Sequence, residues 1–79
     1  MPKEDATMAK MILNSTPQLI SDGTKKVYAT SRAGYFKVIV SNTLPDKQSW
    51  HFEQKIFTDS AKLWAWSDHG DVPIDVSAW

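Results

Sequence analysis

The segment Tyr35–Ser41 is the most strand-like run in the chain and lies close to its middle. Phe36, Val38 and Val40 fall on one side of an extended backbone, and the side chains between them are aromatic, basic and aliphatic. This alternation predicts a β-strand with one apolar face in a core and a second face that a partner could contact. Any fold of this chain has to accommodate that strand.

Other strand candidates lie on both sides of this segment, separated by turn-forming residues. They are Met8–Leu13, Gln18–Ser21, Thr24–Thr30, Gln48–Phe57 and Val72–Ser77. Asp22-Gly23 predicts a hairpin between the second and third, because both residues tolerate a positive φ. In the fourth, Trp50, Phe52 and Ile56 share the apolar side that is expected to face the core, and Gln54 interrupts that side and indicates a sheet edge or a bulge. Pro73 marks the fifth as an edge strand. Consecutive strands joined by short turns predict an antiparallel meander.

The region Ala61–His69 shows a different pattern. Three possible N-caps precede it, no helix breaker occurs before Gly70, and Leu63 and Trp66 stand three residues apart. These features predict a short helix over Ala61–His69. A strand over the same residues, with Leu63 on one side and Trp66 on the other, is the alternative.

The predicted fold class is therefore α+β: a small two-layer domain in which one short helix packs on an antiparallel meander of about four to five strands. This single domain is expected to span residues 8–79, after a flexible leader over residues 1–7. An all-β barrel or sandwich is the alternative fold.

The composition limits both the core and the chemistry. With 79 residues and no cysteine, the chain has a modest core and can form neither a disulfide nor a thiolate metal site. The four Trp, three Phe and two Tyr must supply much of the buried area. No apolar run is long enough for a membrane span or a secretion signal, and we therefore expect a cytoplasmic protein without membrane contact.

Nothing in the sequence favours catalysis. The chain has only His51 and His69, no nucleophile motif and no glycine-rich phosphate loop, and we expect a non-enzymatic protein with no cofactor and no small-molecule substrate. The segment Asp68–Asp71 contains two carboxylates and one imidazole that could bind a divalent cation. Its spacing matches no calcium loop, and helix-end polarity is the preferred interpretation, with no metal expected.

The second face of the predicted sheet has the composition of a binding surface. If the meander holds its register, aromatic and basic side chains alternate on one face. This face consists of Lys26, Tyr28, Tyr35, Lys37, Ile39, His51 and Lys55. Trp64 joins these candidates because a helix cannot bury both Trp64 and Trp66 against one sheet. Either Trp64 or Trp79 is expected to be exposed.

Two functions suit such a face. The preferred hypothesis is a protein-interaction module, an inhibitor or accessory protein of the size class of phage-encoded inhibitors, which binds a larger protein or a second copy of itself. The alternative is a single-stranded nucleic-acid binder, in which rings stack on bases and lysines follow the phosphates. Under either hypothesis, the double substitution Tyr35→Ala with Lys37→Glu is expected to leave the fold intact and impair binding.

Overall fold

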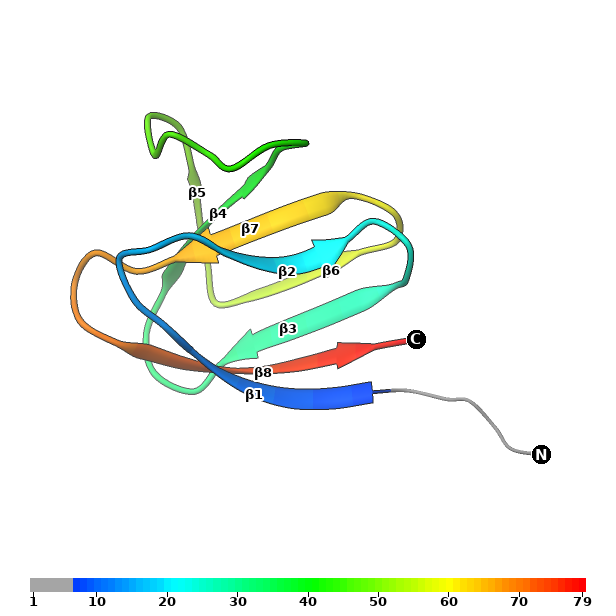
Figure 1. Cartoon of the computed structure of the whole chain (residues 1–79). Coiled ribbons are helices and arrows are strands. Elements are labelled where there is room, and N and C mark those ends of the chain that lie inside the picture. The colour runs from blue at the N-terminus through cyan, green and yellow to red at the C-terminus, as the bar shows by residue number, and fades with distance from the viewer. Residues whose placement is uncertain (1–6) are drawn as a thin grey trace.

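The computed structural model of the chain describes residues 7–79, and within that range every regular element is a β-strand. The strands are β1 (Thr7–Leu13), β2 (Gln18–Asp22), β3 (Val27–Ser31), β4 (Phe36–Val40), β5 (His51–Glu53), β6 (Lys55–Thr58), β7 (Lys62–Trp66) and β8 (Val72–Ala78). They form two antiparallel sheets of four strands each, in the order β1-β8-β3-β6 (sheet A) and β2-β7-β4-β5 (sheet B) (Figure 1). The fold class is all-β, and the α+β prediction is wrong.

The predicted helix over Ala61–His69 is instead strand β7, which lies in the interior of sheet B between β2 and β4. In a strand, Leu63 and Ala65 share the side that faces the core, and both are buried. Trp64 and Trp66 then share the opposite side of sheet B. A helix would have placed these two indoles about 200° apart, and the strand allows one surface to receive both.

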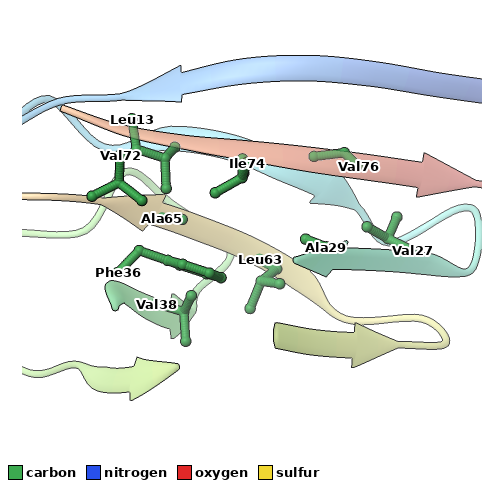
Figure 2. Packing of buried hydrophobic residues seen from close by; sticks show 10 residues of the cluster. All are labelled: Leu13, Val27, Ala29, Phe36, Val38, Leu63, Ala65, Val72, Ile74 and Val76. Atoms are coloured by element: carbon green, nitrogen blue, oxygen red, sulfur yellow. The ribbon is translucent and has the colours of Figure 1, made fainter. Parts of the chain in front are cut away.

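The core lies between the two sheets and is assembled from residues of five strands, β1, β3, β4, β7 and β8. Figure 2 shows its ten buried side chains, which are Leu13, Val27, Ala29, Phe36, Val38, Leu63, Ala65, Val72, Ile74 and Val76. Phe36 and Val38 from β4 belong to this set, as the alternation in Tyr35–Ser41 predicts. Val40 departs from the pattern: it is 62% exposed at the end of β4.

The predicted meander is wrong because consecutive strands lie in opposite sheets at every connection except β4–β5. Asp22-Gly23 does form a turn: the Asp22 carboxylate accepts a hydrogen bond from the Thr24 amide at 2.9 Å, and Gly23 has φ +89°. The turn nevertheless leads from β2 in sheet B to β3 in sheet A, so its strands pair with β7 and with β6 and β8 instead of with each other.

Gln54 marks a change of sheet within the predicted strand Gln48–Phe57. The segment divides into β5, which pairs with β4, and β6, which pairs with β3. The Gln54 carbonyl accepts a hydrogen bond from the Ser31 amide at 2.7 Å. As a result Phe52 lies on the outside of sheet B, whereas Ile56, with the same parity in sequence, packs against the core from sheet A.

Strand β8 is the second strand of sheet A, between β1 and β3, so its predicted edge position is also wrong. Its proline is tolerated because of where the β3 ladder ends. The Pro73 carbonyl accepts a hydrogen bond from the Arg32 amide at 2.9 Å, one residue beyond the end of β3. The N–H that proline lacks would also point toward Arg32, beyond the end of β3. The sheet therefore loses only one hydrogen bond, at the end of the β3–β8 ladder.

The predicted leader over residues 1–7 lies outside the described residues except for Thr7, which begins β1. Residues 7–79 form no helix with the length and hydrophobicity that a membrane crossing requires.

Candidate interaction site

The structure divides the predicted binding face among several places. Lys26, Tyr28 and Lys55 lie on the outer side of sheet A, and Lys37, Ile39 and Trp64 lie on the outer side of sheet B. Tyr35 lies in the β3–β4 connection. His51 is paired with Val38, so it lies on the opposite face of sheet B from Lys37. The two outer sides face away from each other because the core separates the sheets. A single continuous face of these residues does not exist.

The outer side of sheet B is covered around Lys37 and Trp66, which the sequence did not reveal, whereas Phe52 on the same side is exposed. Trp66 is completely buried although it lies outside the core between the sheets, and Lys37, its neighbour across β4 and β7, is only 8% exposed. The segment Ser41–Trp50, the long green loop between β4 and β5 in Figure 1, is tied to this side. Trp64 is partly buried there, and its indole N–H donates to the Ser41 carbonyl at 2.9 Å.

Asp68 joins this loop to the sheet. One carboxylate oxygen accepts a hydrogen bond from Lys37 Nζ at 2.9 Å and from the Trp66 indole at 3.2 Å. The other accepts one from Lys47 Nζ at 2.8 Å, and Lys47 also donates to the Ser15 carbonyl at 2.8 Å. Lys47 has φ +67°, a left-handed conformation that costs a non-glycine residue about 1–2 kcal/mol. The two bonds of its ammonium group offset that cost and hold the loop in place.

These bonds shift the titration of Asp68. Hydrogen bonds from Lys47 and then Lys37 lower the pKa of its carboxyl group from 3.8 to about 2. Because the pKa is lower in the folded state, ionised Asp68 stabilises the fold above pH 3.8, and this contribution is lost as the pH falls through about 2. We expect the thermal midpoint of the wild type to fall between about pH 5 and about pH 2 more steeply than that of Asp68→Asn.

The variant is the necessary control for this pH experiment, because the pKa of Asp22 is also lowered, chiefly by a hydrogen bond from the Thr24 side chain. Both proteins retain Asp22, and only the wild type has the titrating group at position 68. Parallel curves for the two proteins would contradict the role assigned to Asp68.

Six of the nine aromatic side chains are exposed, and they form two groups on opposite sides of the molecule. One group, which we call the β5 aromatic site, consists of Tyr35, Trp50 and Phe52, at 60%, 40% and 55% exposure. Trp50 and Phe52 pack edge to face, with ring centroids 6.4 Å apart. The Lys37 ammonium lies 4.1 Å from the Trp50 ring centroid and supports that ring from the sheet side.

Two hollows adjoin the β5 aromatic site, and Tyr35 and Phe52 line both of them. The first, of about 550 Å³, lies between the β3–β4 connection and the chain from Phe52 to Lys55. The second, of about 250 Å³, extends to the β7–β8 connection, where Asp68, His69 and Asp71 line it. Strand β5 itself is the outermost strand of sheet B. The site therefore combines exposed rings, adjacent concave surface and a sheet edge.

The sequence interpretation missed Trp50 and Phe52, which it placed on the core side of one strand with Ile56. The signal that could have located them was Gln54: a polar residue on the apolar side marks the point where the inward face changes. The preferred interpretation of Asp68–Asp71, helix-end polarity, is wrong because β7 and not a helix precedes this segment, and the sequence did not predict that Asp68 pairs with Lys37 and Lys47. Among residues 7–79, no group of three or more His, Asp or Glu side chains is placed to hold a metal ion.

No protein-family model, curated protein or solved structure matches this chain. The case for a function therefore depends on the geometry of the site.

Proposed function

We propose that this protein is a non-enzymatic interaction module, an inhibitor or accessory protein, that binds a larger protein through the β5 aromatic site. The observation that carries the proposal is the exposure of Tyr35, Trp50 and Phe52 around one edge strand. Large rings exposed together lose stabilisation that burial would provide, and aromatic side chains are the usual anchors of protein interfaces.

The support beneath the rings suits a preformed interface. Lys37 holds Trp50 from below, and Asp68 fixes Lys37. An aromatic anchor whose position is already fixed loses little conformational entropy when a partner binds. The chemistry expected of the partner is an apolar side chain that enters a hollow beside Phe52, on a segment that can run along the edge of β5.

The test uses tagged protein expressed in the host of origin. We expect the wild type to retain one specific protein, and the double variant Tyr35→Ala/Phe52→Ala to lose it, since interface anchors contribute about 2 kcal/mol or more each, about 30-fold in affinity. Trp50 is left unchanged in this variant because it packs on Lys37.

The matched control is Phe57→Ala, which removes an equally exposed ring from sheet A. It should retain the same protein as the wild type. Thermal midpoints of both variants close to that of the wild type would show that the fold is intact. Retention of the same protein by Tyr35→Ala/Phe52→Ala, or retention of none by the wild type together with a monomeric mass in light scattering, would refute the proposal.

A further inference from the structure

The second exposed aromatic group lies on the outer side of sheet A. We call it the sheet A patch, and it consists of Tyr28, Phe57 and Trp79, at 40%, 54% and 48% exposure. Tyr28 and Phe57 are direct neighbours across β3 and β6, which brings their side chains close together. The Phe57 and Trp79 ring centroids are 6.2 Å apart, with an interplanar angle of 39°. The three rings thus form a cluster at one end of the sheet, with Phe57 next to both Tyr28 and Trp79.

Trp79 is held in this cluster by hydrogen bonds of its backbone. Its amide donates to the Lys26 carbonyl and its carbonyl accepts from the Lys26 amide, both at 2.9 Å. These two bonds extend the β3–β8 ladder by one residue pair, Lys26 with Trp79. Lys26 and Tyr28 are two residues apart on one strand and share its outer side, so Trp79 lies on that side too. The ring positions are therefore set by the sheet.

The charges around the sheet A patch are mainly basic. Lys26 lies opposite Trp79, Lys55 lies beside Thr30 in the next row, and both lysines are exposed. The acid in that row, Asp75, is paired with Arg32 at 2.9 Å. In the described residues, no acidic side chain forms an ion pair with Lys26 or Lys55, although Asp59 lies in the turn after β6.

We propose that the sheet A patch binds single-stranded nucleic acid, with bases stacked on Tyr28, Phe57 and Trp79 and phosphates beside Lys26 and Lys55. Exposed rings on an open antiparallel sheet are a surface on which unpaired bases stack, and flanking lysines complement the phosphate charge. The proposal is independent of the β5 aromatic site, which lies on the other sheet.

The experiment is fluorescence anisotropy of the full chain with a labelled single-stranded oligonucleotide of about ten nucleotides, in about 50 mM and about 200 mM salt. We expect binding that weakens with salt, and a weakening of about 5- to 150-fold for each of Tyr28→Ala and Phe57→Ala, because stacking contributes about 1–3 kcal/mol per base. Lys26→Ala and Lys55→Ala should each lower the slope of log affinity against log salt by about 0.7. Duplex DNA should compete poorly because its bases are already stacked.

Phe52→Ala is the matched control, since it removes a comparably exposed ring from the β5 aromatic site and should bind the oligonucleotide as the wild type does. Failure of the wild type to bind at about 100 µM protein in low salt would overturn the proposal, as would equal weakening by Phe52→Ala. A dimer in light scattering that Phe57→Ala dissociates would also overturn it, by showing that the patch contacts a second copy of the chain. None of these results bears on protein capture through Tyr35 and Phe52.

Discussion

Trp66→Ala is expected to unfold about half of the protein or more at room temperature. Trp66 is completely buried on the outer side of sheet B, and its indole donates a hydrogen bond to Asp68. Truncation of a buried tryptophan costs about 3–5 kcal/mol, which equals the whole stability expected of a domain this small. The loss should be measured by urea denaturation followed by circular dichroism, because tryptophan fluorescence changes with the substitution itself.

Trp79→Ala is the matched control for this experiment. It makes the same chemical change at a site that is 48% exposed, and it should cost about 1 kcal/mol or less. Trp66→Phe should fall between the two, since it keeps much of the buried volume and loses the bond to Asp68. Equal stability of Trp66→Ala and Trp79→Ala would show that the outer side of sheet B is not a second core.

Lys37→Glu is expected to have the second largest effect, and it reverses the expectation drawn from the sequence, under which Lys37 faces solvent. In the structure the Lys37 side chain is 10% exposed, and its ammonium group pairs with Asp68 at 2.9 Å. A glutamate there would bring two carboxylates together and remove the cation beneath Trp50. Disruption of such a pair should lower the thermal midpoint by roughly 10 °C or more.

Lys55→Glu makes the same charge reversal on the exposed side of β6, and its thermal midpoint should stay close to that of the wild type. Lys37→Met is the complementary variant: it keeps the aliphatic volume over sheet B and leaves Lys47 as the partner of Asp68. Its midpoint should lie well above that of Lys37→Glu. If Lys37→Glu and Lys55→Glu melt together, the position assigned to Lys37 is wrong.

The local patterns in the sequence located most of the strands, but they took β7 for a helix, merged β5 with β6, and were insufficient to pair the strands. The alternation of Phe36 with Val38 correctly placed both side chains in the core, and the turn at Asp22-Gly23 exists. A turn residue, however, specifies only the local backbone, and the same Asp-Gly pair can reverse a hairpin or lead from one sheet to the other. The choice depends on contacts with distant strands, such as that of β2 with β7, which no local pattern contains.

The prediction of a single binding face was wrong for the same reason. Tyr28 and Tyr35 would share a face only if β3 and the central strand were neighbours in one sheet, and the chain changes sheets between them. Leu63 and Trp66 satisfied a helical spacing by coincidence, because a strand with apolar residues on both sides also places apolar residues three apart. Both sides of β7 are apolar: Leu63 and Ala65 face the core, and Trp64 and Trp66 lie on the outer side of sheet B, where Trp66 is completely buried.

The repeated change of sheet also determines how this chain can reach its native state. Only β4 and β5 are neighbours both in sequence and in a sheet, so no other pair of consecutive strands can form an isolated hairpin. The first and last of the described strands, β1 and β8, pair with each other. Sheet A is therefore complete only after these two distant segments of the chain have come together. A topology of this kind folds in milliseconds to seconds and without early local structure. Until the sheets meet, the aromatic strands remain unpaired, and the chain is then at its greatest risk of aggregation.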